Sequence, residues 1–415
     1  MAIIKSFRGI RPVSHLADKV AALPYDVMDS NEARLMVVDN PYSFLHVDKA
    51  EIDLDPTINP YDKKVYQKAR DNLKEMIRTG ILIQDQENHY YIYKLVMNGR
   101  AQVGLVACTS IDDYLNQVIK KHEHTRPVKE EDRINHVDYC NANTGPILLT
   151  YRSKREINDL INQCMDQQEP VYDIEFDDKV RHTVWIIDSI EVMKQLKDFF
   201  AQVDTLYIAD GHHRCASAVK VGLKRRALYK DHTGEEEFNF FLSVLFPHDQ
   251  LQIMDYNRVV KDLNGNTNNE FLRKIEEKFC IEELQDQRPY SPKEKKKYGM
   301  YLDGIWYSLK AKEGTYPEND PVSSLDISIL QDNLLHPILG IEDPRTDERI
   351  DFVGGIRGLE ELERRVQEDM KVAFSMFPTT IEDLMLVADS GQVMPPKSTW
   401  FEPKLRSGFF VHELS

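Results

Sequence analysis

The residues best suited to chemistry follow a short apolar segment in the middle of the chain. Leu206 to Ala209 predicts a buried strand, and Asp210-Gly211-His212-His213-Arg214 turns directly into a helix. Free N–H groups at a helix N-terminus attract anions, a glycine lets the backbone approach a phosphate, and an arginine fork matches phosphate oxygens. Asp210 is suited to hold a magnesium ion or to orient a hydroxyl. The stretch therefore predicts a phosphate site; the simpler alternative is that Asp210 caps the helix and the histidines are solvated.

A second polar cluster, His122-Glu123-His124, follows a helix that we expect near 111–121. A carboxylate such as Glu123 can accept the proton of a hydroxyl within hydrogen-bond reach. Histidines at adjacent or alternate positions do not share a helix face, so the spacing is poor for a transition metal. The alternative interpretation is a polar helix end.

Two glycine-containing stretches resemble phosphate loops less closely. Gly391 to Ser398 has the Gly and Lys-Ser spacing of a Walker A loop, but Pro395 and Pro396 supply no N–H groups. This excludes a phosphate cradle there, although Lys397 is retained as a candidate for an active site. Phe352 to Gly358 joins a predicted strand to a helix, and it is either an anion nest or a tight turn.

The composition is that of a folded protein with an acidic balance. The 415 residues contain 53 Lys and Arg against 69 Asp and Glu, a formal charge of −16, and 41% are hydrophobic. The length predicts two to three domains. A surplus of acid argues against binding that depends on phosphate backbones, so we expect no nucleic-acid partner and no anionic membrane partner.

The cysteines and the first residues indicate a cellular compartment. The five cysteines show no C-x-x-C pair, which argues against a structural zinc site and fits reduced thiols. The first residues carry no apolar signal region, and no apolar run reaches the length of a membrane span. We therefore expect a cytoplasmic protein.

The patterns predict a mixed α/β chain of the α+β class. Apolar spacing predicts a helix that starts at Asn59-Pro60 and stops at Gly80, and Asn98-Gly99 and Asp303-Gly304 predict two β-hairpins. Helices and strands alternate elsewhere, with a weak stretch over 261–297. We divide the chain into an N-terminal α/β region at 1–100, a core at 101–262 and a C-terminal α/β region at 263–415.

Six separated motifs give the chain a resemblance to a known group of proteins. The motifs are Arg8-Gly9 with Arg11-Pro12, Pro24-Tyr25-Asp26-Val27, Asn40-Pro41-Tyr42-Ser43-Phe44-Leu45-His46, His122-Glu123-His124-Thr125 with Asp132-Arg133, Ile208 to Arg214, and Met394-Pro395-Pro396-Lys397-Ser398-Thr399 with Pro403-Lys404-Leu405. On these, the chain resembles an uncharacterised bacterial and archaeal family in the serine-kinase-like branch of the ParB/sulfiredoxin superfamily.

The resemblance implies a ParB/sulfiredoxin-like nucleotide-binding core and the roles of several residues. Gly211, His212, His213 and Arg214 would bind the phosphates, Asp210 would act in catalysis and hold Mg²⁺, and Glu123 would be the general base. ATP or ADP would be the phosphate donor. The other family motifs would line the same cleft and bring substrate-site candidates, namely Tyr25, Asp26, His124, Arg133 and Lys397.

Three functions are compatible with these expectations. The first is a nucleotide-dependent phosphotransferase for a small hydroxyl substrate, free L-serine giving O-phosphoserine. The second is a non-catalytic nucleotide-binding switch protein. The third, sulfiredoxin-type repair, needs a cysteine where this chain has His212, while Cys215 lies inside the helix. That third function is therefore disfavoured.

Overall fold

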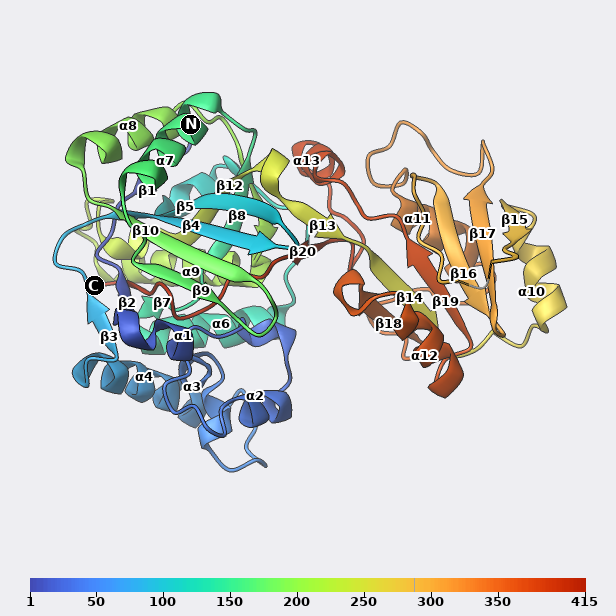
Figure 1. Cartoon of the computed structure of the whole chain (residues 1–415), viewed down its shortest axis with the longest axis horizontal. Coiled ribbons are helices and arrows are strands. Elements are labelled where there is room, and N and C mark those ends of the chain that lie inside the picture. The colour runs from blue at the N-terminus through green and yellow to red at the C-terminus, as the bar shows by residue number, and fades with distance from the viewer. Residues whose placement is uncertain (287) are drawn as a thin grey trace. The chain divides into compact units, whose positions relative to one another are not determined.

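The computed structural model describes residues 1–286 and 288–415 and has the expected α+β class (Figure 1). Contacts divide the chain into two compact units, Met1–Leu251 with Pro403–Ser415, and Gln252–Glu402. The sequence-based regions 1–100, 101–262 and 263–415 divide the chain differently and stay a prediction. In the described part of the chain, no helix has both the length and the apolar character needed to cross a membrane.

A mixed sheet forms the centre of the first unit. Its strands run in the order β6 (Ile119–Lys120), β11 (Leu206–Asp210), β8 (Ile147–Tyr151), β12 (Phe240–Pro247), β5 (Arg100–Ser110), β4 (Tyr90–Met97), β10 (Arg181–Ile187) and β9 (Tyr172–Glu175), and β1 (Ile4–Lys5) also pairs with β5. The pairs β6–β11 and β8–β12 are parallel, and the others are antiparallel. The hairpin β4–β5 confirms the Asn98-Gly99 turn, in which both residues have a positive φ.

Helices of the first unit cover this sheet and build a second core beside it. Apolar residues of α7 (Arg155–Gln167), α8 (Ile190–Phe200) and α9 (His212–Leu228) share one core with the strands. A second core gathers α2 (Ser30–Met36), α3 (Leu45–Asp48) and α4 (Lys63–Arg78), and α6 (Pro127–Cys140) contacts both α4 and α9. Smaller pieces are α1 (Ala17–Val20), α5 (Ile111–Leu115), the pair β2 (Ile10–Pro12) with β3 (Leu82–Gln84), and β21 (His412–Glu413) with β7 (Ala142–Asn143).

The second unit is built on an antiparallel sheet. Its strands run in the order β15 (Phe279–Glu283), β17 (Ile305–Ala311), β16 (Lys297–Leu302), β19 (Val372–Met376), β14 (Tyr256–Val260) and β18 (Ile350–Gly354). The helices are α10 (Asn268–Ile275), α11 (Asp326–Leu330), α12 (Glu360–Glu368) and α13 (Ile381–Asp389), and β13 (Gln252–Met254) pairs with β20 (Trp400–Glu402). The Asp303-Gly304 hairpin is confirmed as β16–β17.

Several sequence-based boundaries are wrong for identifiable reasons. The helix expected near 111–121 ends at Leu115, since Gln117 takes a positive φ and β6 follows. α4 begins at Lys63 because Asp62, not Asn59, caps it. The weak stretch 261–297 contains the strand β15 as well as the helix α10.

Helix α6 was not predicted at all, because its buried side is polar. Four of its buried residues are charged or ionisable: Glu130, Asp132, Arg133 and His136. A helix that buries such residues lacks the apolar stripe by which amphipathic helices are recognised.

Helix α9 continues through Gly222 to Leu228, although a glycine is unfavourable inside a helix. A Cβ built at Gly222 would lie 2.5 Å from the carbonyl oxygen of Phe238 and 2.7 Å from a methyl carbon of Ile111. The glycine is therefore required by close packing on the helix side, not by a helix stop.

We expect Gly222→Ala to destabilise the first unit by about 1–3 kcal/mol, because overpacking outweighs the better helix propensity of alanine. Urea unfolding measures the change. The control is Ala227→Gly on the exposed side of the same helix, which should lose about 1 kcal/mol through propensity alone. A Gly222→Ala protein more stable than the wild type would contradict the packing argument.

Candidate functional site

Parallel pairing of two neighbouring strands brings the two polar clusters together. Leu206 of β11 pairs with Ile119 of β6, so both strands end at the same edge of the sheet. The residues after these ends are the sequence motif 210–214 and the loop 121–126. Glu123 Oε2 lies 3.8 Å from His212 Nδ1. Glu123 thus lies on a loop after a strand, and not at a helix end as the sequence suggested.

The turn from β11 into α9 leaves a helix N-terminus without a side-chain cap. Gly211 is the N-cap residue, its φ is 96°, and it has no side chain to cap the first turn. The backbone N–H that the Asp210 carboxylate accepts is that of Gly211 itself, which precedes the first turn. A Cβ at this position would lie 3.1 Å from Arg214 Nε. The alternative in which Asp210 caps the helix is therefore wrong, and N–H groups of the first turn stay available to an anion.

Arg214 is buried and already bound to several segments. Its Nη2 lies 3.3 Å from Asp210 Oδ2 and 3.9 Å from Asp26 Oδ2, and its Nη1 donates to the carbonyl of Pro146. Nε is buried without a hydrogen-bond partner. Burial opposes the charge, but the two carboxylates outweigh it and raise the pKa of Arg214 above its ordinary value. Arg214 is therefore a charged residue of the site whose two terminal nitrogens already contact other groups of the protein.

A second cation, Lys404, belongs to this cluster and was not among the predicted site residues. Lys404 Nζ lies 3.8 Å from Asp210 Oδ2. Burial raises the pKa of Asp210, but Lys404 and then Arg214 lower it below its ordinary value. Lys404 stands in the motif Pro403-Lys404-Leu405, far from Asp210 in sequence, so only that motif could have indicated its role.

The histidines of the site are not free in solvent. His212 is buried, its ring centroid lies 4.5 Å from that of His122, and its Nε2 accepts the backbone N–H of His122 at 3.5 Å. His213 Nε2 accepts the N–H of Arg126 at 2.9 Å. Burial lowers the pKa of His212 and of His213, and it lowers the pKa of His122 to about 4. These rings are therefore neutral at pH 7, and the interpretation of a solvated pair is wrong for His212.

Six of the predicted site residues of the first unit line two small cavities, three in each. The first, about 80 Å³, is lined by Glu123, His124 and His212, with Tyr114, Lys121, Thr125 and Ile208. The second, about 20 Å³, is lined by Tyr25, Arg133 and Arg214 together with Asp48, His136, Val137, Asn143, Thr144, Gly145 and Ile147. Glu123 thus lines the first cavity and Arg214 the second.

Tyr25 and Arg133 pack directly on each other. The guanidinium carbon of Arg133 lies 4.1 Å from the ring centroid of Tyr25, and Arg133 Nη2 lies 2.8 Å from Asp132 Oδ2. Burial raises the pKa of Tyr25 far above its ordinary value despite the nearby arginines. The phenol therefore stays protonated and can act only as a hydrogen-bonding group.

The remaining candidate, Lys397, belongs to the second unit. Its ammonium lies 5.5 Å from the ring centroid of Tyr256 in that unit. The Gly354-Gly355 stretch is also there, and a Cβ at Gly355 would lie 2.1 Å from Asp255 Oδ1. Close packing thus accounts for that glycine, and the choice between an anion nest and a tight turn stays a prediction.

The motif does not form a metal site by itself. Across residues 1–286 and 288–415, no group of three or more His, Cys, Asp or Glu side chains is arranged to hold a metal ion. Asp210, the predicted magnesium ligand, has its charge met by Arg214 and Lys404. A divalent cation would be repelled by both cations, so these residues do not fit a resident Mg²⁺.

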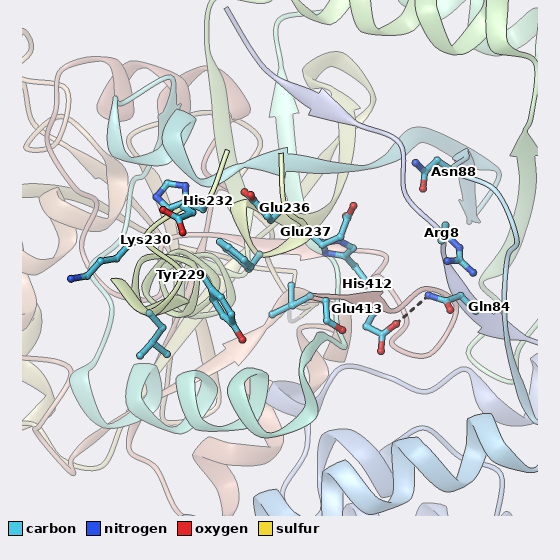
Figure 2. Close-up of a pocket in the computed structure, with 15 residues that line it drawn as sticks. Arg8, Gln84, Asn88, Tyr229, Lys230, His232, Glu236, Glu237, His412 and Glu413 are labelled. Carbon is cyan, nitrogen blue, oxygen red and sulfur yellow. Dashed lines mark hydrogen bonds and ion pairs between the residues drawn. The ribbon is translucent and has the colours of Figure 1, made fainter. Parts of the chain in front are cut away.

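A larger cavity lies elsewhere in the first unit, and Figure 2 shows its lining. Its volume is about 980 Å³, and it is lined by Arg8, Gln84, Asn88, Leu228, Tyr229, Lys230, Asp231, His232, Glu236, Glu237, Phe238, His412, Glu413, Leu414 and Ser415. Its α9 residue, Leu228, is the last of that helix, whereas the sequence motif is at the first turn. None of the predicted site residues lines it.

Comparisons with solved structures give only remote likenesses. A free serine kinase variant in complex with ADP has 14% identity and a TM-score of 0.36 over 72% of this chain and 87% of that chain. A conserved hypothetical protein from Pyrococcus furiosus has 14% identity and a TM-score of 0.35 over 74% and 95%, respectively. C-terminally truncated SbnI from Staphylococcus aureus has 10% identity and a TM-score of 0.35 over 73% and 85%. These TM-scores are too low to carry an argument about function.

The sequence comparisons assign a family. No curated protein matches the chain. The superfamily relationship inferred from the sequence motif stays a prediction. The model of the family described as "Protein of unknown function (DUF1015)" matches residues 4–328, well over half of the chain, and the protein therefore belongs to this family.

Proposed function

We propose that the turn from β11 into α9 binds the phosphate groups of ATP or ADP, and that the protein transfers a phosphoryl group to a small hydroxyl substrate, with free L-serine as the specific acceptor. The observation that carries the proposal is the uncapped first turn of α9, with Lys404 and the unpartnered Nε of Arg214 beside it. N–H groups and cations at one point favour a phosphate over any neutral ligand.

The transfer step assigns a role to Glu123. The serine hydroxyl oxygen attacks the terminal phosphorus of the donor, the bond from that phosphorus to the bridging oxygen breaks, and the hydroxyl proton passes to the Glu123 carboxylate. The products are O-phosphoserine and ADP from ATP, or AMP from ADP. Such transfer depends mainly on positioning and on stabilising negative charge. His212 acts as a positioning residue: with Nε2 accepting a hydrogen bond, Nδ1 carries the proton that faces Glu123.

Magnesium enters this proposal only with the nucleotide, as part of the substrate. Asp210 then orients Arg214 and Lys404 through its carboxylate. The residues themselves hold the donor through N–H groups and cations, so no step is assigned to a resident ion.

The first prediction from this proposal concerns activity. Purified protein with L-serine and Mg·ATP or Mg·ADP should form O-phosphoserine, and Glu123→Gln should lower kcat about 10²- to 10⁴-fold, the usual effect of losing a general base. The matched control is Glu131→Gln, a nearby exposed carboxylate on α6, which should keep full activity. If the Glu123→Gln variant forms phosphoserine as fast as the wild type, Glu123 is not the general base.

The second prediction concerns binding. ADP should raise the Tm of the wild type, and Lys404→Gln should weaken ADP binding about tenfold or more, since a hydrogen bond to a charged group contributes about 1.5–3 kcal/mol. Lys194→Gln, an exposed lysine on α8, should leave the Kd unchanged. An ADP response with no phosphoserine from either donor would favour the nucleotide-binding switch, and no response to either nucleotide would contradict both functions.

The third prediction follows from the neutral histidines. An unfolded histidine has a pKa near 6.5, whereas that of folded His122 is about 4. Between pH 6.5 and pH 4, His122 binds a proton in the unfolded state but stays neutral in the folded state. The stability that the neutral ring contributes is therefore fully present above pH 6.5 and is lost as the pH falls toward 4. The free energy of unfolding should fall by about 1.4 kcal/mol per pH unit for each such histidine.

Urea unfolding between pH 7 and pH 4.5 measures that slope. His122→Gln should reduce this slope by up to about 1.4 kcal/mol per pH unit, the contribution of one proton. His15→Gln, which replaces an exposed histidine, should leave the slope unchanged. Equal slopes in the wild type and the His122→Gln variant would show that this ring titrates normally in the folded protein.

A further inference from the structure

A buried arginine in the second unit has no negative partner among the residues that the structure describes. Arg258, in β14, has 2% of its surface exposed. Its guanidinium donates to the carbonyl of Tyr256 and, at 3.0 Å, to the carbonyl of Lys397. Within the described residues, no carboxylate comes within 4.0 Å of it. These neutral carbonyls accept from two of its N–H groups but leave its charge uncompensated, and an uncompensated buried charge destabilises a folded protein.

The strand explains why the nearest acid does not reach Arg258. Side chains alternate across a strand, so Tyr256 and Arg258 face one side of β14 while Asp255 and Asn257 face the other. Asp255 accepts the amide of Asn257 at 2.6 Å. Across the ladder, Arg258 has Phe352 and Phe374 as partners. The guanidinium thus has aromatic neighbours on both sides, and its pKa is lowered to about 10 by burial.

A second cation without an acid partner adjoins the first. Lys397 is exposed, forms no ion pair among the described residues, and has its ammonium 5.5 Å from the ring centroid of Tyr256. Its φ is 60°, a left-handed conformation that is strained for a lysine. That conformation accompanies the contact between the Lys397 carbonyl and Arg258. The turn 394–399, a sequence motif to which the proposed function gives no role, therefore holds two cations against one tyrosine.

We propose that Arg258 and Lys397, with Tyr256 between them, form a binding site in the second unit for the phosphoryl group of a phosphate-bearing small molecule. Two positive charges match a phosphate dianion, and the guanidinium has five N–H donors, of which the two carbonyls take one each on Nη1 and Nη2. The exposed Lys397 gives access from solvent, and the aromatic surroundings of Arg258 strengthen the attraction by excluding water. The site uses no residue of the sequence motif 210–214 and stands whether or not that motif binds a nucleotide.

The neighbouring Trp400 provides a local signal for this site. Its ring centroid lies 5.2 Å from that of Tyr256, and a Cβ at Gly354 would lie 3.0 Å from its ring. A phosphate bound against Tyr256 should therefore change the emission of Trp400. A Trp400→Phe variant identifies this signal, because the chain has only three tryptophans.

The test titrates the full chain separately with inorganic phosphate, O-phosphoserine and ADP while Trp emission is recorded. The wild type should respond in a saturable way to at least one, and the ligand with the lowest Kd identifies the source of the phosphoryl group. Lys397→Met should weaken that ligand at least tenfold. Lys371→Met, a lysine of the same unit that lies 3.8 Å from Asp303, should leave the Kd unchanged.

Arg258→Met should abolish the response, with circular dichroism checking that the variant folds. Because Lys397 is exposed, its variant decides the question even if the Arg258 variant does not fold. A Lys397→Met protein that binds all three ligands as tightly as the wild type would overturn the proposal. So would a wild type in which none of them changes the emission of Trp400.

Discussion

The first unit depends on one buried guanidinium. Arg214 meets Asp26 from the N-terminal segment, the Pro146 carbonyl beside β8 and Asp210 at the end of β11. Asp210 in turn meets Lys404 from the returning segment 403–415. Because a buried charge must be compensated, these segments cannot separate without leaving a charge in a water-poor environment. The same interaction that holds the segments together thus also places two cations at the first turn of α9.

This arrangement changes what the sequence motif can do. A motif of Asp, His, His and Arg suggests four side chains that all face a ligand. In the structure, Arg214 instead contacts the Asp210 carboxylate and the Pro146 carbonyl. Burial keeps the two histidines neutral. On the proposed function, an anion would meet the N–H groups of the first turn and the Nε of Arg214, with the charge of Lys404 beside Asp210. The protein would therefore recognise a phosphate mostly through its backbone and two fixed cations, which explains why a glycine must precede the helix.

The sequence predicts those parts of the fold that local rules determine. The Asn-Gly and Asp-Gly hairpins, a strand over 206–209 and the helix that stops at Gly80 were predicted and are present, because turn residues and apolar periodicity act over a few positions. Helix α6 was missed since it buries charged residues, and Lys404 was missed since its partner lies far away in sequence. Glu123 was found, but the strand that precedes its loop was not, because β6 is a two-residue strand whose pairing with β11 is a long-range contact.

A single criterion separates the structural role of Arg214 from the ligand-binding role proposed for Arg258. Both side chains are largely withdrawn from water, but of the two only Arg214 has carboxylates within 4 Å among the described residues. In a chain with a surplus of sixteen negative charges, an acid for Arg258 would be easy to supply at a neighbouring position. Its neighbours across the ladder are instead phenylalanines, and its two hydrogen bonds go to neutral carbonyls. A cation kept uncompensated in this way destabilises the folded protein by itself and stabilises it when an anion binds, so its charge is explained by a ligand better than by the fold.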